Sequence, residues 1–172
     1  MTVQKNMKEL LNHIPQQGIV ENILIRPKRK ESPIAVESVF ADSKKGLLGD
    51  HYSSLSGQRQ VTLIQYEHLQ AVAGMLHIER IDPLLTRRNI VVQGINLLAL
   101  KDKQFLVGEV VLEFTGLCHP CSRMEENLGN GGYNAMRGHG GITSKVVKEG
   151  HISIGDKVLI LKNLKNQASE VD

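Results

Sequence analysis

Both cysteines of the 172-residue chain lie in one short segment, residues 118–121, with the sequence CHPC. The apolar run 110–114 precedes this segment, and a glycine-rich segment, 129–141, follows it. A strand that ends in thiols, followed by glycines that let the backbone approach a ligand, is typical of an active centre. We therefore take residues 110–141 as the candidate active centre and ask which chemistry its thiols could perform.

The spacing of Cys118 and Cys121 leaves three interpretations open. The simplest is inert packing, because free cysteine is among the most buried residue types. A dithiol redox site fits the C-x-x-C spacing, and residues 122–129 could open a helix whose N-terminus lowers the thiol pKa. The chain has no proline after Pro120, however, and thioredoxin-like folds place a cis-proline loop opposite the dithiol.

A metal site is the third interpretation. Cys118, His119 and Cys121 could bind zinc together with His139 or His51. Structural zinc usually has two close ligand pairs, and this sequence offers one. A single thiolate is more informative, because it suits a soft metal whose other ligands come from its own cofactor.

Composition limits the classes of function. The net charge of +3 and the pI near 8.9 suit an anionic small ligand, and the few aromatic residues argue against nucleic-acid binding. The core must be built from Leu, Ile and Val. No signal peptide and no apolar run of membrane-spanning length is found, so we expect a cytoplasmic protein with reduced thiols and no membrane partner.

Apolar patterning predicts the elements that position the cysteine segment. Amphipathic helices are predicted over 3–13 and 65–77. Strands are predicted over 18–27, 34–42, 61–64 and 90–93, as two strands around a turn at Gly108-Glu109 within 97–114, and again within 142–161, where Gly155-Asp156 is a hairpin signal. Residues 44–60 are predicted to form a loop.

Short strands, turn glycines and few helices predict a mainly β fold, a closed or nearly closed β-barrel with a few peripheral helices. Strands and helices do not alternate strictly, which disfavours a Rossmann-type sheet. We expect a single domain over residues 1–172, with its core between about residues 18 and 160. The short N-terminal helix and the polar C-terminal tail lie outside that core.

Four segments together carry a family resemblance. They read GLLGDHYSSLSGQRQVTLIQYEHL over 46–69, TRRNIVVQG over 86–94, TGLCHPCSRME over 115–125 and GHGGITSKVVKEGHISIGDKVLI over 138–160. In this order and spacing they resemble MOSC domain proteins, the modules related to the C-terminal domain of molybdenum cofactor sulfurase. The resemblance implies a β-barrel with peripheral helices, which agrees with the patterning.

The resemblance also implies a role for one thiol. The family's sulfur carrier or molybdenum ligand is a cysteine that follows proline, which is Cys121 here. Cys118 departs from the pattern and could be a resolving thiol, an accessory ligand or filler. Studied relatives use molybdenum cofactor to reduce N-hydroxylated compounds, so an oxidoreductase is implied. The alternative is a non-catalytic protein that carries persulfide sulfur or delivers the cofactor.

Further site residues follow from the same resemblance. Cys121 would ligate molybdenum held by molybdopterin, and His51 or His139 would donate protons. The cofactor-binding candidates are Asp50, Arg59, Arg88, Asn89, Arg123 and Arg137, the arginines for the cofactor phosphate and Asn89 for the pterin edge. Each also has a structural alternative: solvated arginines, a turn-ending Asn89 or a loop-capping Asp50. The implied partners are a small-molecule substrate and an electron-transfer or sulfur-donor protein.

Overall fold

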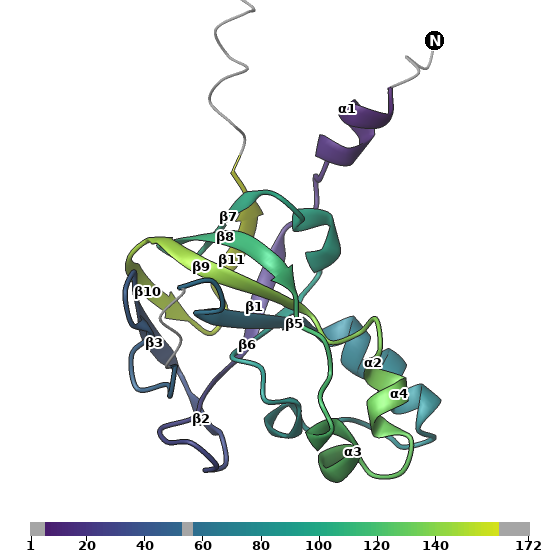
Figure 1. Ribbon diagram of the computed structural model, residues 1–172. Helices are drawn as coiled ribbons and strands as arrows, with labels where there is room; N and C mark the ends of the chain where they lie inside the picture. Colours follow the sequence, from purple (N-terminus) through teal and green to yellow (C-terminus); the bar gives the residue numbers. More distant parts are fainter. Residues whose placement is uncertain (1–5, 53–56, 162–172) are drawn as a thin grey trace, which may run out of the picture.

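The computed structural model describes residues 6–52 and 57–161 and shows a closed β-barrel with a group of short helices at one end (Figure 1). The barrel strands, in chain order, are β1 (Gly18–Ile25), β5 (Val61–Gln65), β6 (Ile90–Gln93), β7 (Gln104–Val107), β8 (Val110–Leu117), β9 (Ile142–Lys148) and β11 (Lys157–Ile160). The predicted mainly β barrel is therefore confirmed.

The barrel closes because β11 pairs with both β7 and β1. The strand order is β11-β7-β8-β9-β5-β6-β1, and Gly18 of β1 lies opposite Val158 of β11. All neighbours are antiparallel except β5 and β6, which are parallel and joined through helix α2 (Tyr66–Met75). β5, α2 and β6 therefore form a βαβ unit, although strands and helices do not alternate strictly along the chain as a whole.

Two predictions about strands were wrong. The stretch 34–42 is two strands, β2 (Ile34–Val36) beside β1 and β3 (Ser38–Asp42) in a second sheet with β4 (Gly46–Leu47) and β10 (Gly150–Ser153). The Gly155-Asp156 turn joins β10 to β11, but these strands pair in different sheets. Turn residues indicate a change of direction, and they do not specify which strands then pair.

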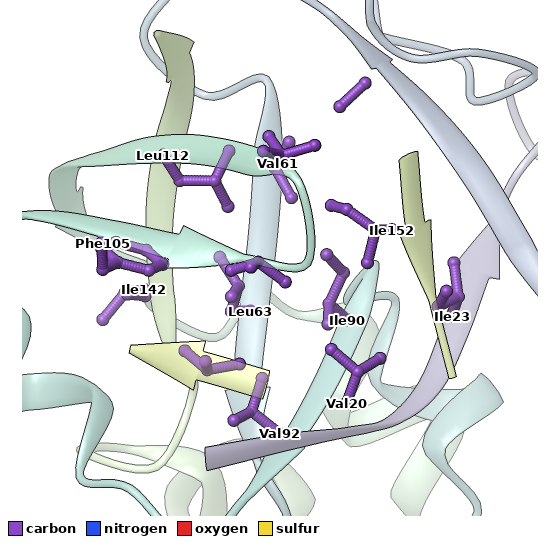
Figure 2. Close-up of a cluster of buried hydrophobic side chains, with 14 of the residues drawn as sticks. Val20, Ile23, Val61, Leu63, Ile90, Val92, Phe105, Leu112, Ile142 and Ile152 are labelled. Carbon is purple, nitrogen blue, oxygen red and sulfur yellow. The ribbon is translucent and has the colours of Figure 1, made fainter. Parts of the chain in front are cut away.

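Aliphatic side chains fill the barrel, as the composition predicts (Figure 2). Leu63, Ile90 and Val92 point into this core, with Phe105 as its aromatic member. Because side chains alternate along a strand, the intervening Ile64 and Val91 point outward and pack under the helices. The strands β5 and β6 are thus buried on both faces, which is typical of parallel pairs.

The helical layer consists of α2, the 3-10 turn η1 (Pro83–Thr86), α3 (Arg123–Leu128) and α4 (Gly132–Met136), which lie together at one end of the barrel (Figure 1). Met124 of α3 and Met136 of α4 are fully buried against Val72 of α2 in this layer. The structure differs from the sequence prediction in two segments. Residues 97–100 form a second 3-10 turn, η2 (Leu97–Leu100), and the glycine-rich segment contains a helix.

Helix α1 (Met7–Asn12) begins with a capping box between Asn6 and Glu9. It projects away from the barrel, and all six of its residues are exposed. None of the helices in the described part of the chain is long and apolar enough to span a bilayer. The predicted polar tail from residue 162 lies outside the described residues.

Candidate functional site

The cysteine segment continues directly from the end of strand β8. Leu117 pairs with Ile142 of β9, and the Cys118 amide donates a hydrogen bond of 2.9 Å to the Gly141 carbonyl. The Cys118 side chain is buried, with 4% of its surface exposed, whereas the Cys121 thiol is exposed. Of the two thiols, Cys121 is therefore the one that a ligand or partner can reach.

Gly140 and Gly141 fix the opposite side of this segment by close packing. A Cβ on Gly140 would overlap the Cys118 carbonyl oxygen, and one on Gly141 would overlap the Leu63 carbonyl oxygen. Gly141 also has a φ of 86°, which disfavours any other residue. These two glycines therefore permit close backbone packing, and the segment around them is neither an open loop nor a lid.

The guanidinium of Arg88 holds the backbone of the cysteine segment in place. It is 6% exposed and donates to the carbonyls of Gly140 at 2.7 Å, Thr86 at 2.8 Å and Cys118 at 3.2 Å. A longer bond of 3.4 Å reaches the His119 carbonyl. The hydrogen-bonding capacity of Arg88 is thus directed at the protein's own backbone, although the residue lines the pocket described below.

Asn89 similarly joins three strands. Its side-chain oxygen accepts from the Thr62 amide at 3.0 Å and the Thr62 hydroxyl at 2.8 Å, and its amide group donates to the Leu24 carbonyl at 3.2 Å. An amide nitrogen has two hydrogens, so one remains for a ligand. Asn89 therefore orders the ends of β1, β5 and β6 beneath the pocket.

A pocket of about 100 Å3 opens at these strand ends. It is lined by residues 24–26, 33, 50–52, 59, 60, 62 and 87–89, and we call it the arginine pocket. Five residues predicted for the site, Asp50, His51, Arg59, Arg88 and Asn89, are brought together in its wall.

Asp50 and His51 are positioned by the backbone of Arg26. The Asp50 carboxylate accepts from the Arg26 amide at 2.7 Å, and the His51 amide donates to the Arg26 carbonyl at 2.6 Å. Asp50 thus caps the neighbouring strand end and not its own loop, and this places the His51 side chain at the pocket wall.

Polar groups without partners face this pocket or lie close to it. The buried Nε of Arg26 and the buried hydroxyl of Tyr52 have no hydrogen-bond partner in the described part of the chain. The guanidinium groups of Arg87 and Arg123 also make no hydrogen bond or ion pair within residues 6–52 and 57–161. Buried polar groups are normally paired, so the Arg26 Nε and the Tyr52 hydroxyl are available to a polar ligand or to water.

The pKa of Arg87 is affected by its burial and by the positive charges around it. Burial is the main cause that lowers its pKa, and the charges of Arg26, Arg123 and Arg88 lower it further, whereas a Cys121 thiolate raises it. Its backbone has a φ of 59°, a left-handed conformation that is uncommon for a long side chain and is often found at functional sites. An anion bound here would relieve the repulsion among these arginines.

Comparison with known proteins identifies this architecture. Residues 50–159, more than half of the chain, match the family model described as MOSC domain. This chain belongs to the MOSC domain family. No sequence among the curated proteins matches it.

Solved structures share the MOSC fold at low sequence identity. The YuaD protein of Bacillus subtilis superposes with a TM-score of 0.73 at 17% identity, over 86% of this chain and 98% of that one. YiiM from Geobacillus stearothermophilus gives 0.67 at 14% identity, over 84% and 75%, and YiiM from Escherichia coli gives 0.64 at 16% identity, over 85% and 71%. These similarities establish the fold.

Sequence reasoning missed three residues of this MOSC site: Arg26, Tyr52 and Arg87. Of the neighbouring Arg87 and Arg88, it selected Arg88, whose guanidinium is bound to carbonyls, while that of Arg87 has no hydrogen-bond partner within residues 6–52 and 57–161. The quoted motifs did contain two of the three: Arg87 lies in the arginine-asparagine motif beside Arg88, and Tyr52 directly follows His51 in the segment 46–69. Arg26 directly follows strand β1, and nothing in its neighbourhood marks it.

The remaining predicted residues lie around this site or beyond it. Arg59 is exposed at the mouth of the arginine pocket, and its Nη2 lies 3.9 Å from the Cys118 sulfur. Arg123 begins α3 and is close enough to Arg87 to affect its pKa. Arg137 lies elsewhere, in a second pocket of about 490 Å3 lined by His119, Pro120, Tyr133, Arg137 and Gly138, which we call the α4 pocket.

His139 directly follows Gly138 of the α4 pocket and lines neither pocket. Its Nδ1 lies 3.0 Å from the Arg137 carbonyl, and its ring contacts that of His68 edge-on, with centroids 5.1 Å apart. The Nδ1 of His68 is buried without a partner in the described residues, and burial, then the charge of His139, lowers the pKa of His68. The pair packs α2 against the segment after α4.

The zinc and dithiol interpretations can now be compared with the geometry. In the described part of the chain, no three His, Cys, Asp or Glu side chains converge into a possible metal-binding group. His51 lies in the arginine pocket and His139 beside His68, so neither joins the two thiols. The thiols are free, and one is buried while the other is exposed.

Proposed function

We propose that this MOSC protein binds molybdenum cofactor through the thiolate of Cys121 and reduces N-hydroxylated small molecules. The observation that carries the proposal is an exposed thiol close enough to Arg87 to affect its pKa, where Arg87 lines a pocket with buried polar atoms that have no partner among the described residues. A thiolate suits a soft metal, and guanidinium groups suit the phosphate of a pterin cofactor.

The size and polarity of the arginine pocket fit the anionic end of such a cofactor. Its volume of about 100 Å3 equals a few water molecules at roughly 30 Å3 each, which is enough for a phosphate group and not for a tricyclic pterin. Arg26 and Arg87 would bind the phosphate, with the Tyr52 hydroxyl as a further donor. The rest of the cofactor would then lie between this pocket and Cys121.

The reaction is a two-electron reduction, in which R–NHOH, two electrons and two protons give R–NH2 and water. When bound, the cofactor supplies the electrons, which it would receive from an electron-transfer protein. Cys121 would hold the metal, and Arg88 holds the backbone of the segment that carries Cys121. From the wall of the pocket that would hold the phosphate, His51 would supply a proton through bound water to the leaving hydroxyl oxygen as the N–O bond breaks.

Cofactor content tests the binding proposal directly. Wild-type, Cys121→Ser and Cys118→Ser proteins are purified after co-expression with the cofactor pathway, and molybdenum and pterin are measured for each. We expect about one molybdenum per chain in the wild type and in Cys118→Ser, and none in Cys121→Ser. No molybdenum in any of the three proteins would overturn the proposal.

Activity tests the chemical step. Benzamidoxime is offered to the loaded protein under anaerobic conditions with chemically reduced viologen as electron donor, and benzamidine is measured. We expect His51→Asn to lower kcat by about a hundredfold and to remove one limb of the pH profile while molybdenum content stays normal. An unchanged pH profile in that variant would remove His51 from the proton-donor role.

A persulfide carrier is the second candidate, favoured by the exposure of Cys121 to partner proteins. A carrier needs a reachable sulfur and no pocket for a reducible substrate. Mass spectrometry after incubation with a cysteine desulfurase and cysteine would show a gain of one sulfur atom on Cys121. A persulfide in protein that never acquires molybdenum would favour this function over the reductase.

A further inference from the structure

The α4 pocket borders the cysteine segment and shares no lining residue with the arginine pocket. Its volume of about 490 Å3 lies within the range of roughly 300–1,000 Å3 that is typical of small-molecule sites. The arginine pocket, at about 100 Å3, is well below that range. Of the two, the α4 pocket is therefore the one large enough for a whole organic substrate.

The wall of the α4 pocket is held by contacts between α3 and α4. The Glu125 carboxylate accepts hydrogen bonds from the amides of Gly131 at 2.8 Å and Tyr133 at 3.0 Å. Gly132 packs so closely on the Met124 carbonyl that a Cβ there would lie 2.5 Å from its oxygen. The backbone that carries Tyr133 is thus fixed before any ligand binds, which reduces the entropy cost of binding.

Two side chains give this pocket its chemical character. Tyr133 is 39% exposed, so part of its ring is open to a stacking partner. Arg137 is exposed, and its guanidinium makes no hydrogen bond or ion pair within residues 6–52 and 57–161. An aromatic ring beside a free planar cation suits a flat ligand that carries a carboxylate or another oxyanion.

The α4 pocket also lies next to the residue that carries the exposed thiol. Pro120 lines it and is bonded directly to Cys121, so their Cα atoms are about 3.8 Å apart. His119, also in the wall, precedes Pro120 and has its carbonyl held by Arg88. A ligand that fills the pocket can therefore extend a small group toward a metal on Cys121.

We propose that the α4 pocket is the substrate subsite and that it selects aromatic N-hydroxylated compounds that carry an anionic group. Tyr133 stacks on the ring, and Arg137 binds the anion and so sets the distance of the N–O group from Cys121. This inference rests on the proposed reductase function. It also gives Arg137 a role with the substrate in place of the role with the cofactor that the sequence suggested.

The test compares two probes, benzamidoxime and 4-carboxybenzamidoxime, on the cofactor-loaded protein. Binding to the oxidised protein is measured by calorimetry, and KM and kcat by turnover. We expect the wild type to bind the carboxylate compound about 10- to 100-fold more tightly. Arg137→Gln removes that preference and keeps the affinity for benzamidoxime, Tyr133→Leu weakens both probes, and Lys148→Gln on the exposed end of β9 behaves as wild type.

Other outcomes overturn the proposal. Equal binding of both probes by the wild type, or an unchanged preference in Arg137→Gln, would show that Arg137 does not bind the anion. Loss of molybdenum in Arg137→Gln would place Arg137 at the cofactor. Failure of the subsite proposal can be distinguished from failure of the reductase proposal. The binding preference depends on Arg137 and is also measured in Cys121→Ser, so it tests the subsite. Metal content and turnover test the reductase function alone.

Discussion

The arginine pocket and the α4 pocket differ in how their arginines are used. At the arginine pocket, Arg88 donates four hydrogen bonds to backbone carbonyls, while the Arg26 Nε and the Arg87 guanidinium beside it have no partner among the described residues. At the α4 pocket, Arg137 is exposed, and its guanidinium has no partner in the same part of the chain. Arginines of one site can therefore have opposite roles, and the hydrogen-bond partners of each guanidinium separate those that hold the protein from those available to a ligand.

The largest effect is expected from Arg88→Met compared with Arg137→Met. Removal of the Arg88 guanidinium leaves the buried carbonyls of Gly140, Thr86 and Cys118 without a donor, which costs on the order of 3 kcal/mol of unfolding free energy. Arg137→Met should change that free energy by less than about 0.5 kcal/mol. Urea unfolding of the two variants measures the difference, and equal losses would contradict the assigned roles.

Two glycine substitutions should change the unfolding free energy by smaller amounts and in opposite directions. Gly140→Ala forces the chain away from the Cys118 carbonyl and should lower the unfolding free energy by about 1–3 kcal/mol. Gly74→Ala, in α2 with open space around it, should raise it by roughly 0.5–1 kcal/mol. Thermal unfolding distinguishes these outcomes, and a stabilising Gly140→Ala would show that the segment is not tightly packed.

The free arginines should destabilise the protein without its ligand. Arg87→Gln removes one of several like charges near Cys121 and should raise the unfolding free energy by about 0.5 kcal/mol at low salt. The gain should shrink as ionic strength rises, because salt screens the repulsion. Urea unfolding at two salt concentrations measures this, and a loss of stability like that of Arg88→Met would mean that Arg87 has a structural partner.

The smallest expected effect on the unfolding free energy comes from the pair His68 and His139, whose rings contact each other edge-on. Because the folded pKa of His68 is lowered from 6.5, the native state binds fewer protons than the unfolded state. The stability from neutral His68 is present above pH 6.5 and is lost as the pH falls through the folded pKa. Urea unfolding between pH 7.5 and 5 should show a shallower slope for His68→Gln than for the wild type.

Proton NMR provides a second check on the same pair. The His68 titration should be displaced below 6.5 in the wild type, and His139→Gln should move it partly back upward because one nearby positive charge is gone. A His68 pKa that does not respond to that substitution would mean that burial alone displaces it.

Much of the fold could be predicted from the sequence because periodicity reports burial. The runs 61–64 and 90–93 become β5 and β6, and the helical pattern after residue 65 becomes α2. Pairing partners were harder, since β10 and β11 follow one another in sequence yet belong to different sheets. Local patterns contain no information on which distant strand lies alongside.

The candidate site could be predicted only in part for a similar reason. The spaced motifs pointed to Asp50, His51, Arg59, Arg88 and Asn89, and these do line one pocket. The sequence did not indicate that the Arg88 guanidinium is bound to carbonyls while that of Arg87 finds no partner in the part of the chain that the structure describes, because hydrogen bonding depends on backbone direction after folding. It also placed Arg137 with the other arginines, although the fold puts it in a separate pocket.

Closure of the barrel through β1 and β11 has a consequence for how this module joins other chains. Gly18 and Val158 lie opposite each other in that pairing, so the first and last barrel strands are neighbours, about 4.8 Å apart. Figure 1 shows that the start of β1 lies at the end of the barrel away from α3 and α4. A domain with adjacent ends can be inserted into a loop of a larger protein.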